Sequence, residues 1–167
     1  ADRELAENYE PLEILGIVKY LTSRSEPFEY LAREEVSESP SAERGKLLFE
    51  TRGCLACHEH QDFPAAASDF GPDLSNVGDK FSSSAGARDG AAWLYSWIKQ
   101  PTHYHARSKM PDLYLLPIED EEGKTTDPAA DITAYLLESS NDWQPPQQSV
   151  DKLRPDKDQL DDIVLGM

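Results

Sequence analysis

The stretch Gly53-Cys54-Leu55-Ala56-Cys57-His58 decides the fold of this chain. It holds both cysteines of the 167 residues, three positions apart, with a histidine directly after the second. Two cysteines so close together cannot close a large loop, which excludes a framework of structural disulfides. Because three residues make about one helical turn, both thiols can face the same partner.

The pattern C-x-x-C-H is typical of the attachment site of a c-type haem. The two thiols can bond to the two vinyl-derived carbons on one edge of a haem, and His58 is then held under the iron as an axial ligand. Three other interpretations stay open. A thioredoxin-like redox pair needs a strand and a parallel sheet, of which the sequence shows no sign. A zinc site needs further ligands, and only the crowded His58 and His60 lie near. The two cysteines could also have no functional role.

Composition narrows the class of protein. The chain has 16 Lys and Arg against 32 Asp and Glu, a net charge of −16. Such an acidic chain is a poor partner for nucleic acid or an anionic membrane surface, and it lacks the run of about 18 apolar residues that a transmembrane helix needs. Hydrophobic residues make up only 38%, with 12 prolines. We therefore expect either partial disorder or a fold built around a group that is not protein.

Hydrophobic periodicity predicts four helices and no convincing strand pair. The helices are expected at about residues 11–23, 41–52, 89–99 and 127–140. The stretches 63–88 and 101–126 show little periodicity, and two loops of about 25 residues are unusual inside a compact domain. A large buried ligand would remove the difficulty, because the loops could wrap around it.

We expect three regions along the chain. Residues 1–40 form an N-terminal extension with one helix, residues 41–142 form the functional module, and residues 143–167 form a Pro/Gln-rich linker with an acidic tail.

One short sequence pattern occurs in both the first and the second region. The pattern I-x-x-Y-L occurs at Ile17, Tyr20 and Leu21 and again 115 residues later, at Ile132, Tyr135 and Leu136. Either the extension is the tail of a preceding domain of the same kind, or it is an extra helix that packs on the module.

The region from residue 45 to residue 140 resembles the class I cytochrome c family. Four features occur in the family's order: a helix ending in G-C-L-A-C-H, then Gly71-Pro72-Asp73-Leu74, then Met110-Pro111-Asp112-Leu113, and a last helix with the second I-x-x-Y-L pattern. The resemblance implies an all-α cytochrome c fold. Three to five helices and long loops would wrap one covalently bound haem c, with an extra helix at the N-terminus.

The resemblance also implies roles for single residues. Cys54 and Cys57 would hold the haem, and Met110 would bind the iron opposite His58. The carbonyl of Pro72 would accept a hydrogen bond from the His58 ring, which fixes its tautomer. Gly45 and Phe49 would cross Tyr135 and Leu136. The haem pocket would be lined or edged by Leu74, Trp93, Trp97 and Tyr104, with a tryptophan or Lys80 on a propionate, although such apolar residues are often plain core.

The second iron ligand has competitors. Met110 lies in the polar, proline-bounded segment 108–111, which fits a loop ligand better than core packing. His103 or His105 could instead give a bis-histidine iron. His60 is expected to be a solvated loop residue.

With both axial positions filled, no substrate can reach the iron. The resemblance therefore implies one-electron transfer, by a carrier or by a relay domain of a larger redox protein or respiratory chain, rather than an enzyme. The alternative is a haem sensor or peroxidase-like enzyme with an open iron position. A third possibility is a haem-free zinc or interaction module.

The expected partners are a donor and an acceptor redox protein, and neighbouring domains of the same polypeptide. A basic patch on a partner would be steered toward the acidic run 119–122, although such a run is often just a solvated loop. Haem attachment to C-x-x-C-H takes place outside the cytoplasm in this family. The resemblance thus implies the periplasm or the outer face of an energy-conserving membrane.

Overall fold

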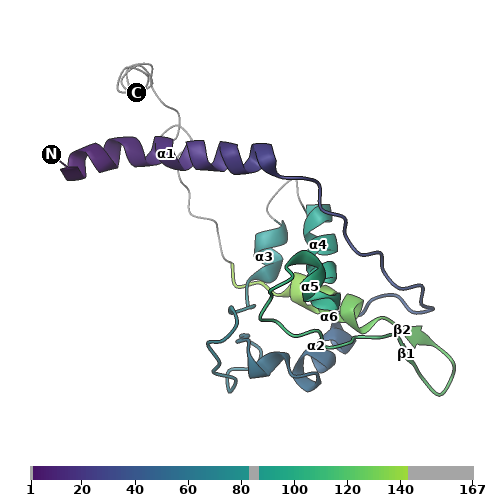
Figure 1. Ribbon diagram of the computed structural model, residues 1–167. Helices are drawn as coiled ribbons and strands as arrows, with labels where there is room; N and C mark the ends of the chain where they lie inside the picture. The colour runs from purple at the N-terminus through teal and green to yellow at the C-terminus, as the bar shows by residue number, and fades with distance from the viewer. Residues whose placement is uncertain (1, 83–86, 143–167) are drawn as a thin grey trace. The chain divides into compact units, whose positions relative to one another are not determined.

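The computed structural model describes residues 2–82 and 87–142, which form parts of two compact units. The smaller unit contains α1 (Asp2–Arg24), and the larger spans residues 29–145. The larger unit holds α2 (Ala42–Thr51), the 3-10 turn η1 (Cys54–Ala56), α3 (Val77–Ser82), α4 (Ala87–Lys99), α5 (Pro101–Tyr104) and α6 (Pro128–Glu138) (Figure 1). Its nearly all-helical content confirms the predicted all-α class. Among the described helices, none has the length and apolar character to cross a membrane.

Local sequence sets where α2 and α6 begin. The Ser41 hydroxyl accepts a hydrogen bond from the backbone N–H of Arg44 at the start of α2. The Asp127 carboxylate accepts from the N–H groups of Ala129 and Ala130 at the start of α6, and Pro128 occupies the first helical position. These caps satisfy amide groups that a helix leaves without partners at its N-terminus.

The two capped helices cross in direct backbone contact at Gly45. A Cβ atom on this residue would overlap the carbonyl group of Asp131 and lie 2.9 Å from Cβ of Tyr135. One turn further on, the rings of Phe49 and Tyr135 lie 5.6 Å apart. This is the crossing that the resemblance implied. Only glycine allows so close an approach.

An ion pair between α2 and α6 reinforces the crossing. Asp131 of α6 is fully buried, and Arg44 of α2 donates to both of its carboxylate oxygens, at 3.0 Å from Nε and 2.9 Å from a terminal nitrogen. The backbone N–H of Ser41 adds a third hydrogen bond at 2.7 Å. Paired, charge-assisted bonds of this kind fix orientation as well as distance.

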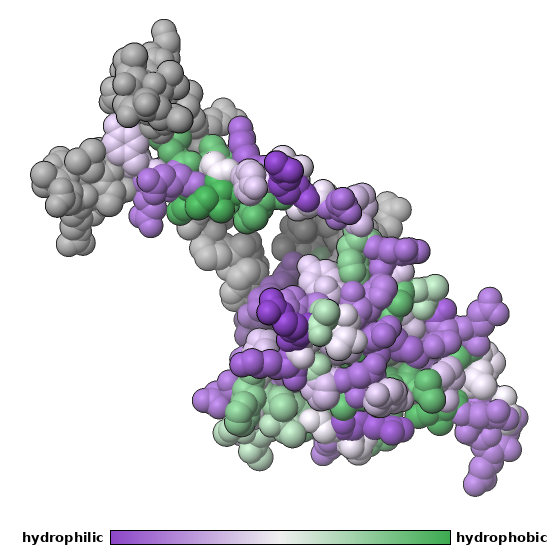
Figure 2. Space-filling view, viewed as in Figure 1, coloured by the Kyte–Doolittle hydropathy of each residue, from purple (hydrophilic) through white to green (hydrophobic). Residues whose placement is uncertain are grey.

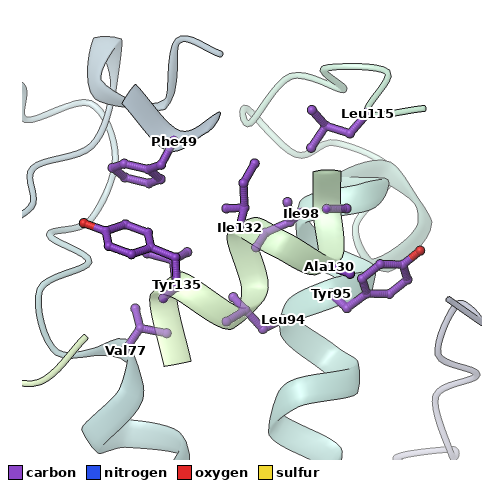
Figure 3. Close-up of a cluster of buried hydrophobic side chains, with 11 residues drawn as sticks. Phe49, Val77, Leu94, Tyr95, Ile98, Leu115, Ala130, Ile132 and Tyr135 are labelled. Carbon is purple, nitrogen blue, oxygen red and sulfur yellow. The ribbon is translucent and has the colours of Figure 1, made fainter. Parts of the chain in front are cut away.

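The hydrophobic core lies between α6 and the helices around it (Figure 3). Ile132 of α6 and Leu94 and Ile98 of α4 meet at its centre, and Leu115 closes it from a loop. The buried apolar set is Phe49, Val77, Leu94, Tyr95, Ile98, Leu115, Ala129, Ala130, Ile132, Tyr135 and Leu136. Helix α6 is thus the element on which the larger unit packs.

The expectation of no strand pair was wrong. Strands β1 (Ile118–Glu119) and β2 (Thr125–Thr126) form an antiparallel hairpin. Asp120 closes its turn by accepting from the N–H groups of Glu122 and Lys124, and Gly123 adopts a positive φ of 80°. Two residues per strand are too few to produce an alternating pattern.

Two short helices lie inside segments that were expected to be loops. Helix α3 interrupts the segment 63–88, and α5 begins at Pro101, the first residue of the segment 101–126. They have six and four residues, so neither repeats a helical pattern long enough to be recognised. Tertiary contact explains α3, since Val77 belongs to the buried core and Phe81 packs against it.

The segment 29–40 runs extended along the larger unit. The N–H of Leu31 donates to the Ser96 hydroxyl at 2.8 Å, and the N–H of Glu38 donates to the Thr125 carbonyl at 3.0 Å. Glu34 forms an ion pair with Lys99 at 2.8 Å. The segment therefore packs against α4 and the β1–β2 hairpin within the larger unit. The predicted boundary after residue 40 stays a prediction.

We predict that Gly45→Ala lowers the free energy of unfolding by about 3 kcal/mol, because its methyl group meets the backbone of α6. The matched control is Gly16→Ala in α1, where a Cβ atom would meet nothing within 4 Å. That change should be neutral or stabilise by about 0.5–1 kcal/mol. Urea unfolding of the purified protein, followed by circular dichroism, measures both. Equal stabilities for the two variants would contradict the close crossing.

Candidate functional site

The thiol pair lies in one tight turn directly after α2. Gly53 adopts a φ of 89°, a left-handed conformation that favours glycine and ends the helix. The backbone N–H groups of Cys57 and His58 then both donate to the carbonyl of Cys54, at 3.1 and 2.9 Å. Both cysteines are half-buried. The turn thus brings two thiols and an imidazole together at the end of one helix.

The His58 ring is oriented by Pro72. Its Nδ1 lies 2.8 Å from the Pro72 carbonyl oxygen, as the resemblance implied. Because a carbonyl can only accept a hydrogen bond, Nδ1 carries a proton, and in the neutral ring the lone pair is then on Nε2. A neutral imidazole fixed in this way is the form in which histidine binds a metal through Nε2.

Gly71 supports the same ring from one side. A Cβ atom on this residue would lie 2.6 Å from both Cε1 and Nδ1 of His58. The N–H of Gly71 donates to the Cys57 carbonyl at 2.7 Å, and the N–H of Leu74 donates to the Glu59 carbonyl at 3.0 Å. Two backbone bonds therefore join the segment 71–74 to the turn that carries the histidine.

Met110 lies in a loop whose conformation is set by short-range hydrogen bonds. Its N–H donates to the Ser108 hydroxyl at 3.1 Å, and its side chain is half-buried. Further along, the Asp112 carboxylate accepts from the N–H of Tyr114, which has a positive φ of 51°. The loop is tied to α4, because the Leu115 carbonyl accepts from Nζ of Lys99 at 2.7 Å.

The predicted aromatic residues gather into one cluster. The rings of Trp93 and Trp97 are stacked at 5.6 Å with an interplanar angle of 9°, and Tyr104 stands edge-on to both at 5.6 Å. Phe81 joins the cluster at 5.7 Å from Trp93. The two tryptophans are only half-buried and Tyr104 is 47% exposed. Aromatic surface is thus left for a further apolar group to cover.

The remaining predicted site residues lie in separate places. Leu74 packs against the hydrophobic core, and Lys80 is an exposed residue of α3. Nε2 of His103 lies 3.0 Å from the Glu29 carbonyl oxygen, and Nδ1 of His105 accepts from the N–H of Arg107 at 3.2 Å. Both alternative histidines therefore already have a hydrogen-bonding partner for one ring nitrogen.

His60 was wrongly expected to be a solvated loop residue. It is 3% exposed, and both ring nitrogens are hydrogen-bonded. Nε2 lies 2.8 Å from the Ser139 hydroxyl, and Nδ1 accepts from the N–H of Asp62 at 3.2 Å and lies 3.0 Å from the Tyr135 hydroxyl. Because Nδ1 accepts, Nε2 carries the proton. Burial lowers the pKa of this imidazole, so it is a neutral structural residue.

Sequence reasoning missed the polar network around His60. The Tyr135 hydroxyl donates to the Asp62 carboxylate at 3.1 Å, and Lys46 pairs with the same carboxylate at 2.6 Å. The hydrogen bonds from Lys46 and Tyr135 are the main interactions that lower the pKa of Asp62. The network joins α2, the segment after His58 and α6. No sequence signal could have revealed it, because Tyr135 lies 75 positions from His60.

The residues present fit a c-type haem. They supply two thiols one turn apart, an imidazole with Nε2 available, a thioether in a loop, and half-buried aromatic rings. Burial raises the pKa of the Cys54 thiol to about 11, so this thiol is protonated near neutral pH. A parallel sheet beside the thiols, which a thioredoxin-like site needs, does not occur among residues 2–82 and 87–142. In that same part of the chain, no three His, Cys, Asp or Glu residues are grouped to hold a metal ion.

We predict that His60→Ala lowers the free energy of unfolding by about 2–4 kcal/mol, because it removes a buried ring and leaves buried polar groups without partners. The control His105→Ala removes an exposed ring and should cost less than about 0.5 kcal/mol. Both are measured by urea unfolding of the haem-loaded protein. If His60→Ala lowered the free energy of unfolding no more than the control does, the structural role of the buried His60 ring would be refuted.

Comparison with known proteins identifies the family. The family model for cytochrome c matches residues 42–140. A nitric oxide reductase subunit from Stutzerimonas stutzeri is 29% identical over 116 residues, which cover 67% of this chain and 72% of that protein. Cytochrome c oxidase subunit 2 of Bacillus subtilis (strain 168) is 28% identical over 83 residues, which cover 48% of this chain. The matched part spans only 23% of that oxidase subunit.

Among solved structures, SoxXA from P. pantotrophus matches with a TM-score of 0.48 and 19% sequence identity, over 68% of this chain and 95% of that one. The match of the family model over more than half of the chain decides the assignment. The chain belongs to the cytochrome c family and carries a covalently bound haem c.

Proposed function

We propose that this chain transfers single electrons as a relay domain of a larger redox protein or respiratory chain, through a haem c attached to Cys54 and Cys57. His58 and Met110 are the proposed axial ligands. The observation that carries the proposal is the hydrogen bond from Nδ1 of His58 to the Pro72 carbonyl, because it leaves Nε2 as a ready iron donor. The haem supplies an iron that changes between the ferrous and ferric states.

The chain's own residues suit a closed iron. Pro72 and Gly71 hold the His58 ring in one orientation, and the Ser108 hydroxyl holds the backbone of Met110. If His58 supplied an imidazole and Met110 a thioether to the iron, no position would remain for a substrate. A thioether raises the reduction potential, because it favours ferrous over ferric iron. This arrangement supports electron transfer rather than catalysis at the metal.

Two contacts favour Met110 over the histidines near it. His103 is engaged with the Glu29 carbonyl, and His105 accepts from the Arg107 amide. Either side chain would have to give up its present orientation to turn toward an iron. Met110 has no competing polar contact to break, since a thioether is only a weak acceptor.

The aromatic cluster is the proposed wall of the haem pocket. Trp93, Trp97 and Tyr104 form one half-exposed surface that a porphyrin can cover, and Leu74 adds an apolar contact near the His58 turn. Lys80 on the exposed side of α3, or a tryptophan N–H, is the proposed partner of a propionate. Covering these rings would exclude water and disfavour the extra positive charge of ferric iron.

The proposed partners are basic redox proteins. The acidic run 119–122 forms the exposed tip of the β1–β2 hairpin, and Lys124 neutralises part of it by pairing with Glu122 at 2.9 Å. A net charge of −16 steers a basic patch at long range, and salt weakens this steering. Two relatives are, by their names, subunits of redox enzymes, which supports a relay within a larger assembly. The resemblance implies that haem is attached outside the cytoplasm, so the proposed location is the periplasm or the outer face of an energy-conserving membrane.

We predict that Met110→Ala abolishes the sulfur-to-iron charge-transfer band of the ferric protein, opens the iron to carbon monoxide and lowers the reduction potential. Each tenfold loss of preference for ferrous iron corresponds to about 59 mV for a one-electron couple. The controls His103→Ala and His105→Ala should keep the band. An unchanged potential in Met110→Ala would favour a bis-histidine iron. A parent protein that lacks the band and binds peroxide readily would favour the sensor or peroxidase-like alternative.

We predict that Gly71→Ala raises the reduction potential. The added methyl group lies 2.6 Å from the His58 ring and pushes Nδ1 away from Pro72. A weaker hydrogen bond makes the imidazole less basic, which disfavours ferric iron. A tenfold change in the preference for ferrous over ferric iron corresponds to about 59 mV for a one-electron couple. Asp69→Ala, in the same exposed loop, is the control and should leave the potential unchanged. Identical potentials for the two variants in a redox titration would refute the orienting role of this contact.

A further inference from the structure

Helix α1 exposes large apolar side chains. Ile14, Ile17, Val18, Tyr20 and Leu21 are each between 48% and 61% exposed. Figure 2 shows apolar side chains gathered along this helix. A Cβ atom on Gly16 would also meet nothing within 4 Å. A contiguous apolar surface of this kind usually marks a contact with another protein surface.

The apolar surface is too wide for a single partner helix. At 100° per residue, the apolar positions 14, 15, 17, 18, 20 and 21 spread over about 220° of the helix circumference. The stripe that an ordinary amphipathic helix buries is about 100° wide, and a coiled-coil seam is narrower. Glu13 and Arg24 flank this segment in the same sector, so the wide apolar surface is confined to residues 14–21. A segment that is apolar over more than half of the helix circumference needs to be enclosed from several sides.

This chain contains a helix that is enclosed in that way. Helix α6 packs against α2, α3 and α4. From its second residue onward, residues 129–133, 135 and 136 are buried, and Ala134 is only half-buried. The I-x-x-Y-L pattern of α6 is part of this buried set, and the same pattern occurs 115 residues earlier in α1.

The apolar positions of α1 match the buried positions of α6, beyond the residues of the shared I-x-x-Y-L pattern. Shifted by 115 residues, the buried positions 129–133, 135 and 136 of α6 correspond to positions 14–18, 20 and 21 of α1. All seven of these α1 positions hold an apolar residue or glycine. The half-buried Ala134 corresponds to Lys19, the polar residue within the stretch. The buried Pro128, the first residue of α6, corresponds to Glu13 and is the exception. Over residues 14–21, helix α1 is therefore apolar at the places where α6 is enclosed.

We propose that α1 is the last helix of a second haem-binding domain of the same kind, which precedes it on the same polypeptide. Its partners are the helices of that domain that correspond to α2, α3 and α4. The contact of Gly45 and Phe49 with Tyr135 shows what covers such a tyrosine. The helix that covers Tyr20 should thus carry a small residue followed four positions later by an aromatic one. This inference rests on the proposed electron transfer, which it extends to two haems on one polypeptide.

The first test is the haem content of the whole polypeptide, as produced from its gene in the native organism. We expect two haems per polypeptide in a pyridine haemochrome assay, and a second C-x-x-C-H about 115 residues before Cys54. One haem per polypeptide would overturn the proposal. The sulfur-to-iron band of the Met110 haem tests the proposed function separately. A single haem that shows the band would refute the second domain and leave the proposed function standing. Two haems without the band would refute only the proposed Met110 ligation.

The second test compares Leu21→Asp with Lys19→Asp in the same whole polypeptide. Leu21→Asp should reduce the haem content from two to one, while mass spectrometry still finds haem on the peptide that contains Cys54. Lys19→Asp should keep both haems, because this position corresponds to the half-buried one. Equal haem contents would contradict the proposal. So would a change from dimer to monomer in Leu21→Asp at unchanged haem content, since a second copy would then cover α1.

Discussion

The backbone contact between α2 and α6 at Gly45 is the constraint on which the rest of the larger unit depends. Helix α2 leads directly into the turn that carries Cys54, Cys57 and His58, so its position fixes where the proposed haem attachment begins. Tyr135 of α6 and Ser139, directly after this helix, hydrogen-bond to His60 and hold the segment after His58. One close helix crossing therefore positions both ends of the site.

Hydrogen bonding distinguishes the four histidines of this chain. Both ring nitrogens of His60 are used inside the protein, and one nitrogen each of His103 and His105 is used by a backbone group on the surface. In His58 the acceptor on Nδ1 is the Pro72 carbonyl, which leaves Nε2 as an oriented lone pair. Of two histidines that are two positions apart in the sequence, His60 is thus a buried structural residue and His58 is the proposed iron ligand. The partner of each ring nitrogen decides the role, and residue type alone does not.

The sequence predicts those parts of the structure that local chemistry specifies. The cap residues Ser41 and Asp127 place the starts of α2 and α6, and the motif at Cys54 indicates the haem. Features that depend on distant residues could not be predicted. Helix α3 forms where Val77 enters the core, the β1–β2 hairpin has only two residues per strand, and His60 is buried by residues about 75 positions away. A single sequence records none of these long-range contacts.

Because a single sequence does not record long-range contacts, the I-x-x-Y-L pattern shared by α1 and α6 can be interpreted only with the structure. A match to a five-residue pattern arises easily by chance in a chain of 167 residues. Burial along α6 divides its residues into enclosed and half-exposed positions, and this division is independent of the letters that match. Residues 14–21 of α1 follow the same division, with Lys19 at the half-buried position, while Glu13 at the position of the buried Pro128 departs from it. An apolar helix surface of this width costs solubility unless something encloses it, and α6 shows that this protein's own fold is able to do so.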